Sequence, residues 1–436
     1  MGEGVENEAV RGAGFGLSFV LGGLRWANNF QRAVTLGFCM IEYMKLRVAC
    51  VLVTGCAWGA TYSKDVAPIL NRHCVECHRA GEVAPMVFTS YQAVRPWAKA
   101  IREQVVTATM PPWLADPHVG EFKNDRRLAQ SEIDTIVAWV GAGAPEGDAK
   151  ELPPAPHFLE GWNIGKPDQI FDYGADFEVP AEGVVDYQYY KVPTNFTEDK
   201  WVEAAEIRPQ HRAVTHHINV FILEPGQKST DGEMLTGFAP GVQPLRLEPG
   251  SAMLVKAGSV FLFQSHYTPN GKAVKDRSFV GLRFAKQPPV LRSITDRAYN
   301  ALFRIPPGDP NHLVKSSWTA MQDVDLFALL PHMHFRGKDF RYTVVYPDGR
   351  EQVILNVPKY DFNWQLGYEL KAPLHLPKGS RIDCVAHFDN SPNNKYNPDP
   401  TKEVRWGDQT WDEMMIGFFL YKVPAAAPRA VQTTSE

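Results

Sequence analysis

Arg341-Tyr342-Thr343-Val344-Val345-Tyr346 is a run of β-branched and aromatic residues that predicts a strand. Pro347-Asp348-Gly349-Arg350 follows with residues that favour a tight turn, and residues 352–355 predict the returning strand. Similar short runs recur from about residue 166 onward, without regular helices between them, for example at residues 260–263 and 415–421. This pattern favours antiparallel β-sandwiches.

The β-rich region covers residues 166–423, which is longer than one sandwich usually needs. We therefore expect two sandwiches, residues 166–292 and 293–423, divided near the segment from Pro288 to Thr295. Residues 424–436 are expected to form a disordered tail. The chain has 436 residues and a formal net charge of -4, which argues against a nucleic-acid partner.

A helical pattern precedes the β-rich region and predicts a small all-α domain over residues 61–150. Ser63 can cap a first helix, and a second helix is expected to start near Ser131 and to stop at Gly141. The Pro-rich residues 151–165 that follow are expected to form a linker.

The predicted helical domain contains Cys74-Val75-Glu76-Cys77-His78. In this motif the two thiols bond the vinyl groups of a haem, and the adjacent histidine supplies an axial nitrogen. A zinc site would need a second pair of cysteines, and the sequence has none nearby. The motif therefore predicts a cytochrome c-like domain with one covalently bound haem c.

Two methionines are candidates for the sixth haem ligand. Met110 lies in a Pro-rich loop that could present its sulfur across the haem, and we favour it. Met86 follows His78 by only eight residues, so we expect it to be too close to reach the opposite face. His73 and His118 are interpreted as surface residues.

Residues 1–60 predict a leader with a bacterial export signal whose translation start is Met44. Val53-Thr54-Gly55-Cys56 resembles a lipobox, in which Cys56 would be lipidated and become the mature N-terminus. The alternative is an ordinary cleaved signal that ends near Ala60. Both alternatives predict a periplasmic or otherwise extracytoplasmic protein, and the first predicts a membrane-anchored lipoprotein.

Histidines in the β-rich region suggest metal binding. His332 and His334 are two residues apart, so on a strand they share a face and can bind one ion. A third, softer ligand would complete a site for copper that cycles between oxidation states. We interpret the remaining histidines of this region as structural: His211, His312, His375 and His387.

A second histidine group combines His216, His217 and His266. The first two are adjacent and would face opposite sides of a regular strand. Binding one metal with both requires a bulge, a turn or the use of different ring nitrogens, and His266 offers a third imidazole from a neighbouring strand. Three nitrogen ligands without sulfur would suit a copper that transfers electrons.

With these motifs, residues 166–423 resemble the copper type II, ascorbate-dependent monooxygenases, the family of peptidylglycine α-hydroxylating monooxygenase and dopamine β-monooxygenase. The resemblance rests on the order and separation of His216-His217, Gln264-x-His266-Tyr267, His332-x-His334 and Asp412-Glu413-Met414. It implies two jelly-roll sandwiches that face each other across an open cleft. It also implies two copper ions: one on His216, His217 and His266 that stores electrons, and one on His332, His334 and Met414 that binds oxygen and substrate.

The sequence departs from the peptide-amidating members in two ways. Those members contain several disulfides, which this chain cannot form, because Cys384 is the only cysteine left in its folded body once haem claims Cys74 and Cys77. They also anchor a substrate carboxylate with polar residues, and the corresponding positions here are apolar: Leu330, Ile416 and Phe418. The replacements favour a small apolar or neutral substrate.

The leading hypothesis is an exported copper-dependent monooxygenase that uses O2 to hydroxylate a C–H bond. Electrons would come from an external donor through the fused haem. The first alternative is a non-catalytic protein that transfers electrons or handles copper. The second is a dehydrogenase, in which copper oxidises a substrate and the haem exports the electrons.

Overall fold

The computed structural model describes residues 59–158, 161–227 and 231–425. The predicted start at Met44, the export signal, Cys56 and residues 426–436 of the predicted tail lie outside the described residues. Among the helices that are described, none is both long and apolar enough to cross a membrane.

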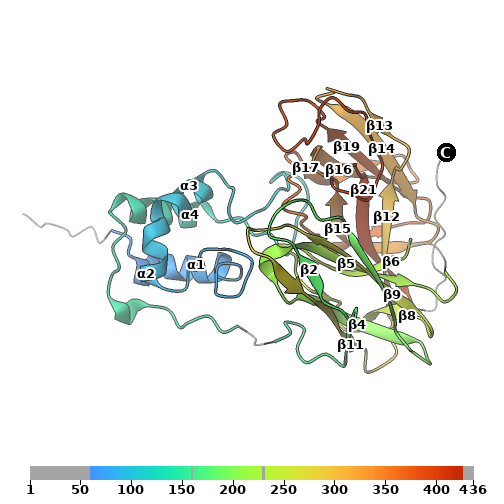
Figure 1. Cartoon of the computed structure of the whole chain (residues 1–436), viewed down its shortest axis with the longest axis horizontal. Coiled ribbons are helices and arrows are strands. Elements are labelled where there is room, and N and C mark those ends of the chain that lie inside the picture. Colours follow the sequence, from blue (N-terminus) through green and yellow to red (C-terminus); the bar gives the residue numbers. More distant parts are fainter. Residues whose placement is uncertain (1–58, 159–160, 228–230, 426–436) are drawn as a thin grey trace, which may run out of the picture. The chain divides into compact units, whose positions relative to one another are not determined.

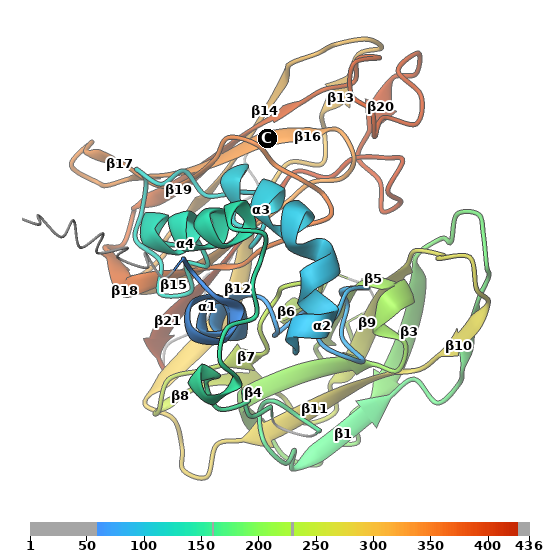
Figure 2. The same ribbon diagram turned by 90° about the vertical axis from the view of Figure 1, so that its left-hand side faces the viewer.

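Four short α-helices gather before residue 150 (Figures 1 and 2). Leu70, Val94, Ile136 and Trp139 are completely buried in their shared core. The cap expected at Ser63 is wrong, because Thr61 accepts the Lys64 N–H and Ser63 is itself buried in the first turn. The helical elements are η1 Tyr62–Val66, α1 Ala67–His73, α2 Tyr91–Val94, η2 Arg95–Trp97, α3 Ala98–Val106, α4 Gln130–Gly141 and η3 Ala149–Glu151.

The helix expected from Ser131 to Gly141 is confirmed as α4, which begins one residue earlier, at Gln130. Its N-terminus is stabilised by Glu132, whose carboxylate accepts the Ala129 N–H at 2.9 Å. The helix ends where Gly143 adopts a positive φ of 87°, a conformation that glycine reaches without strain.

Two sheets enclose the first β core. One sheet has the strand order β3-β9-β5-β6, and the other contains β1-β11-β4-β8, with β7 paired to β4. Val220, Phe263 and Val280 come from both sheets and are completely buried. The bounds are β1 Gln169–Asp172, β2 Phe177–Val179, β3 Gln188–Pro193, β4 Lys200–Pro209, η4 Arg212–Val214, β5 Thr215–Leu223, β6 Glu233–Phe238, β7 Leu245–Arg246, β8 Ser251–Val255, β9 Val260–Tyr267, β10 Val274–Asp276 and β11 Ser278–Phe284.

A second core lies between the strands β12-β21-β15-β18 and the sheet β14-β19-β16-β17. Leu329, Phe340, Phe388 and Phe419 are completely buried there. The bounds are β12 Leu291–Tyr299, β13 Arg304–Ile305, β14 His312–Thr319, β15 Val324–His332, β16 Gly337–Val345, β17 Glu351–Val357, β18 Tyr368–Leu376, β19 Arg381–Phe388, β20 Val404–Arg405 and β21 Ile416–Pro424.

The prediction of a mainly β structure with sandwich packing is confirmed. Strands β16 and β17 pair around the turn expected at residues 347–350, and Gly349 adopts there a φ of 85° that the turn requires. The two cores share one nine-stranded sheet, because β8 pairs in parallel with β12 through Ser251 and Leu291.

The connection between α3 and α4 packs against the second core. Trp113 and Ala115 are buried within that core, and Phe122 forms a bridge with Leu370. The Asn124 side chain donates to the Gly367 carbonyl and accepts the Glu369 N–H. Part of the predicted domain 61–150 is therefore fastened to the second sandwich.

Candidate functional site

The first histidine group consists of His216 and His217 on β5 and His266 on β9. The pairing of these strands shifts between Thr215 and His217, so a bulge lies at His216. The bulge allows adjacent imidazoles to turn to the same side. The Nδ1 atom of His216 lies 3.1 Å from Nδ1 of His217 and 3.3 Å from Nδ1 of His266.

Three imidazole nitrogens that converge in this way fit a metal ion, and one ligand atom from each histidine lies within 4.8 Å of the others. Burial lowers the pKa of His216 to about 4 and that of His266 to about 3. Burial and the neighbouring histidines also lower the pKa of His217. The imidazoles are therefore neutral at pH 7, which is the form that binds metals.

A buried carboxylate supports the first histidine group from behind. Asp276 accepts hydrogen bonds from the Tyr267 hydroxyl at 3.0 Å and from the His211 N–H at 2.7 Å. Tyr267 directly follows His266, and His211 begins the turn that leads to His216. One side chain thus fixes both segments that carry the ligands.

The second ligand group was predicted to be His332, His334 and Met414. The rings of His332 and His334 have centroids 5.2 Å apart. His332 Nδ1 lies 2.7 Å from Gln365 Oε1, and His334 Nδ1 lies 3.3 Å from the carbonyl oxygen of Asp412. These acceptors place a proton on each Nδ1 and leave Nε2 free as a ligand atom.

His334 suits the role of a metal ligand, because its Nε2 atom is buried without a hydrogen-bond partner. Burial lowers the pKa of His332 to about 4 and moves that of His334 in the same direction. Both imidazoles are neutral at pH 7 and can bind a cation through Nε2.

Met414 belongs to the segment just before β21, which pairs with β15 in antiparallel order. His332 is paired with Ile416, and the Glu413 carboxylate accepts the His334 N–H, so the residue that directly precedes Met414 contacts His334. The other methionines considered are engaged elsewhere: Met333 lies in the second core, and Met415 accepts a hydrogen bond from Ser316 at 3.2 Å.

Glu413 supports the second ligand group, a role that the sequence did not indicate, although the residue lies in the motif Asp412-Glu413-Met414. It is completely buried, and its carboxylate accepts the N–H groups of His334 at 2.9 Å and Arg336 at 2.6 Å. Burial raises its pKa to about 8. Glu413 therefore fastens the segment of His334 to the segment of Met414.

Two aromatic side chains connect the ligand groups. Phe362 stacks on His216 with centroids 4.7 Å apart and lies 5.9 Å from His334. Tyr187 lies 4.7 Å from His266 and 6.4 Å from His334. These buried aromatic rings therefore lie between parts of the two ligand groups.

A small inner cavity of about 70 Å³ lies where the groups approach each other. His217 and His332, whose ring centroids are 6.5 Å apart, both line it. Its wall includes Leu330 and Phe418, two of the three positions interpreted from the sequence as apolar replacements. The third, Ile416, does not line the inner cavity.

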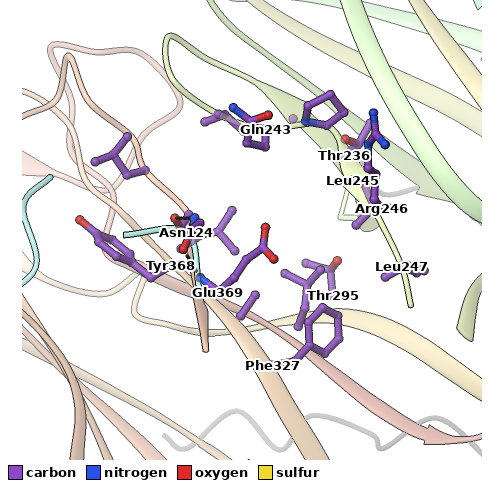
Figure 3. A pocket seen from close by; sticks show the side chains of 18 of the residues that line it. Asn124, Thr236, Gln243, Leu245, Arg246, Leu247, Thr295, Phe327, Tyr368 and Glu369 are labelled. Atoms are coloured by element: carbon purple, nitrogen blue, oxygen red, sulfur yellow. Dashed lines mark hydrogen bonds between the residues drawn. The ribbon is translucent and has the colours of Figure 1, made fainter. Parts of the chain in front are cut away.

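An outer cavity of about 110 Å³ shares Leu330 with the inner cavity. On one side, Asn124 lies near Tyr368 and Glu369, and Gln243 and Arg246 lie on the other (Figure 3). The lining of the outer cavity is more polar than that of the inner cavity. The two cavities together could admit a small molecule that has an apolar part.

The structure describes all three residues of the predicted haem motif. Cys74 and Cys77 are free thiols, and His78 Nδ1 lies 3.1 Å from the Met86 carbonyl oxygen, which leaves Nε2 free for iron. The His78 ring also stacks on Phe88 at 4.3 Å. Because the Met86 backbone contacts His78 itself, Met110 remains the favoured sixth ligand.

The other histidines have simpler surroundings. His118 is exposed, as expected for a surface residue, whereas His73 is half-buried and lies 3.2 Å from Glu132. Three histidines interpreted as structural each contact an aspartate: His312, His375 and His387.

We expect the exported protein to carry one covalent haem that Cys77→Ala disrupts. Each thiol supplies one thioether, so the variant retains at most one such bond, and its haem signal should fall by most of its intensity. Haem staining after denaturing electrophoresis measures this. Cys384→Ala is the matched control, since its buried thiol lies in the second core and should not affect the signal. Wild-type protein matured without covalent haem would contradict the prediction.

Comparison with known proteins adds no family. No family model and no curated protein matches the sequence. Solved structures with partial likeness include the major capsid protein P2 of bacteriophage PM2, at 7% identity over 59% of this chain and 97% of that chain, with a TM-score of 0.25. The structure of infectious bursal disease virus Gt strain is 8% identical over 62% of this chain and 75% of that chain, with a TM-score of 0.19. Allantoicase is 8% identical over 49% of this chain and 79% of that chain, with a TM-score of 0.15. TM-scores this low support no inference about function.

Proposed function

We propose that this chain is an exported copper-dependent monooxygenase that hydroxylates a C–H bond of a small apolar or neutral molecule with O2. A haem c on the helical domain would receive electrons from an external donor and pass them to copper. The observation that carries the proposal is that two buried histidine groups, one of three residues and one of two, each contribute a residue to the wall of one cavity, His217 from the first and His332 from the second.

The two ligand groups would have different roles. His216, His217 and His266 would hold a copper that stores an electron, since nitrogen ligands serve both of its oxidation states. His332, His334 and Met414 would hold a second copper, which supplies oxygen activation when bound. The protein contributes fixed tautomers and a largely dry site.

The lining of the inner cavity supports the substrate class. Leu330 and Phe418 offer no hydrogen-bond donor to a carboxylate, and burying an unpaired charge beside them would be costly. Asn219 and Gln365 are the polar side chains at the wall apart from the histidines. An apolar or neutral group beside His332 is therefore favoured.

Labelled oxygen tests the proposal. The copper- and haem-loaded protein is incubated with a reductant, ¹⁸O₂ and a small-molecule extract of the producing cells. We expect a product that carries one ¹⁸O atom and is absent without protein. Oxidised products without label would favour the dehydrogenase alternative, and consumption of reductant without any organic product would favour the electron carrier.

A further inference from the structure

We propose that the ion pair of Glu82 and Arg212 is the contact through which the haem motif delivers electrons to the first histidine group. The inference rests on the proposed function and deepens it, because it assigns Arg212 as a positioning residue for electron transfer. A haem held by Cys74, Cys77 and His78 would give up one electron, and a metal held by His216, His217 and His266 would accept it. No covalent bond forms or breaks.

The contact is a partly buried cluster of charges. Glu82 Oε1 lies 2.8 Å from a guanidinium nitrogen of Arg79, and Glu82 Oε2 accepts a hydrogen bond from Arg212. The Glu82 and Arg212 side chains are only 13% and 17% exposed. Such a pair is less screened by salt than an exposed one, so it can hold a fixed geometry.

The pair joins the two segments that carry the ligands. Glu82 follows His78 by four residues, and Arg212 precedes His216 by four residues. Arg212 lies in the short turn η4, where the Thr215 hydroxyl donates to the His211 carbonyl at 3.0 Å. The ion pair therefore links the segment of the predicted axial histidine to the segment of His216.

A second contact fixes the same face of the haem motif. Glu76, within the motif, accepts a hydrogen bond from the Gln243 side chain at 2.6 Å. Glu76 and Glu82 lie on either side of Cys77 and His78 in the sequence, and both contact the first sandwich. These two carboxylates thus fasten the motif to the first sandwich.

The contact between the haem motif and the first sandwich is made by polar and charged side chains. The buried members of the helical core include no residue of either sandwich among those described, and the connection between α3 and α4 is joined instead to the second core through Trp113 and Ala115. Polar contacts of this kind suit the alignment of electron-transfer partners. Here the linker keeps the partners together.

Flash reduction of the haem in oxidised, copper-loaded, full-length protein measures the step directly. Arg212→Ala and Glu82→Gln should slow the first-order reoxidation of haem at least about tenfold, and Arg212→Lys should recover part of the rate because it keeps the charge. Glu178→Gln is the matched control: Glu178 forms an exposed pair with Lys275 on the same sandwich, 3.1 Å long, and its loss should leave the rate unchanged.

Haem potential and the copper EPR spectrum are recorded for each variant. We expect both to match the wild type, which would separate positioning from damage to either centre. Rates for Arg212→Ala and Glu82→Gln within twofold of the wild-type rate would overturn the contact while leaving the proposed function intact. Absence of concentration-independent reoxidation in the wild type would overturn both.

Discussion

His332→Ala should abolish hydroxylation while the first histidine group keeps its copper. The variant removes one of the two imidazoles of the second group, and the His216, His217 and His266 side chains do not depend on it for their mutual contacts. Loss of a residue that only hydrogen-bonds to a metal ligand typically lowers metal affinity or activity by about 10- to 100-fold. Loss of a ligand itself should therefore lower turnover by at least about 1000-fold. Product formation and copper content measure the two effects.

Met414→Ala should have the same effect on turnover and a distinct spectroscopic signature. X-ray absorption on the reduced wild-type protein should contain a Cu–S contribution that disappears in this variant. His375→Ala is the control, because that histidine is exposed and pairs with Asp325. Persistence of the Cu–S contribution would refute Met414 as the ligand and return Met333 or Met415 to consideration, although the structure engages both elsewhere.

Local sequence patterns were sufficient for the elements that short-range chemistry determines. The turn at residues 347–350 and helix α4 follow from residues that lie next to each other in the chain. The spacing of His332 and His334 also indicated a pair, but the strand alternation behind that prediction does not apply, because β15 ends at His332 and His334 lies in the loop that follows. These features need no knowledge of which strands become neighbours.

The rest of the site depends on pairing between distant strands. The bulge at His216 arises from the alignment of β5 with β9, and adjacent histidines alone left three geometries open. Glu413 supports His334 only because β15 lies beside β21. Phe362 and Tyr187 come from loops with no metal-binding pattern, so their position between the ligand groups could not be predicted.

Pairing between distant segments also decides how the predicted haem and copper regions meet. A CxxCH motif and a histidine group on one chain suggest an electron path, but they do not say which surfaces meet. The structure adds two carboxylates beside His78 that contact the first sandwich, and a turn that leads from one contact to His216. Substitutions at the haem motif or at the first histidine group can therefore test the proposed electron path.

His217→Ala should sharply slow the passage of electrons from haem within one molecule. His217 is a buried member of the first group and the one whose ring lies 6.5 Å from that of His332, so its loss should disable the copper that would receive the electron. Reduced protein is mixed rapidly with O2 and the small-molecule extract, and haem reoxidation is followed by absorbance. In the wild type the rate should not depend on protein concentration, because the linker fixes the effective concentration of the donor.

In His217→Ala the reoxidation should fall at least about 100-fold, to the level of direct reaction between haem and O2, since the remaining two imidazoles bind copper weakly. His387→Ala is the matched control, because its ring contacts Asp339 on the second sandwich, and it should retain the wild-type rate. A rate that is unchanged in His217→Ala, or that rises with protein concentration in the wild type, would mean that the haem serves an external partner. Slow reoxidation in both variants would instead indicate a general loss of folding, which the haem spectrum and copper content would reveal.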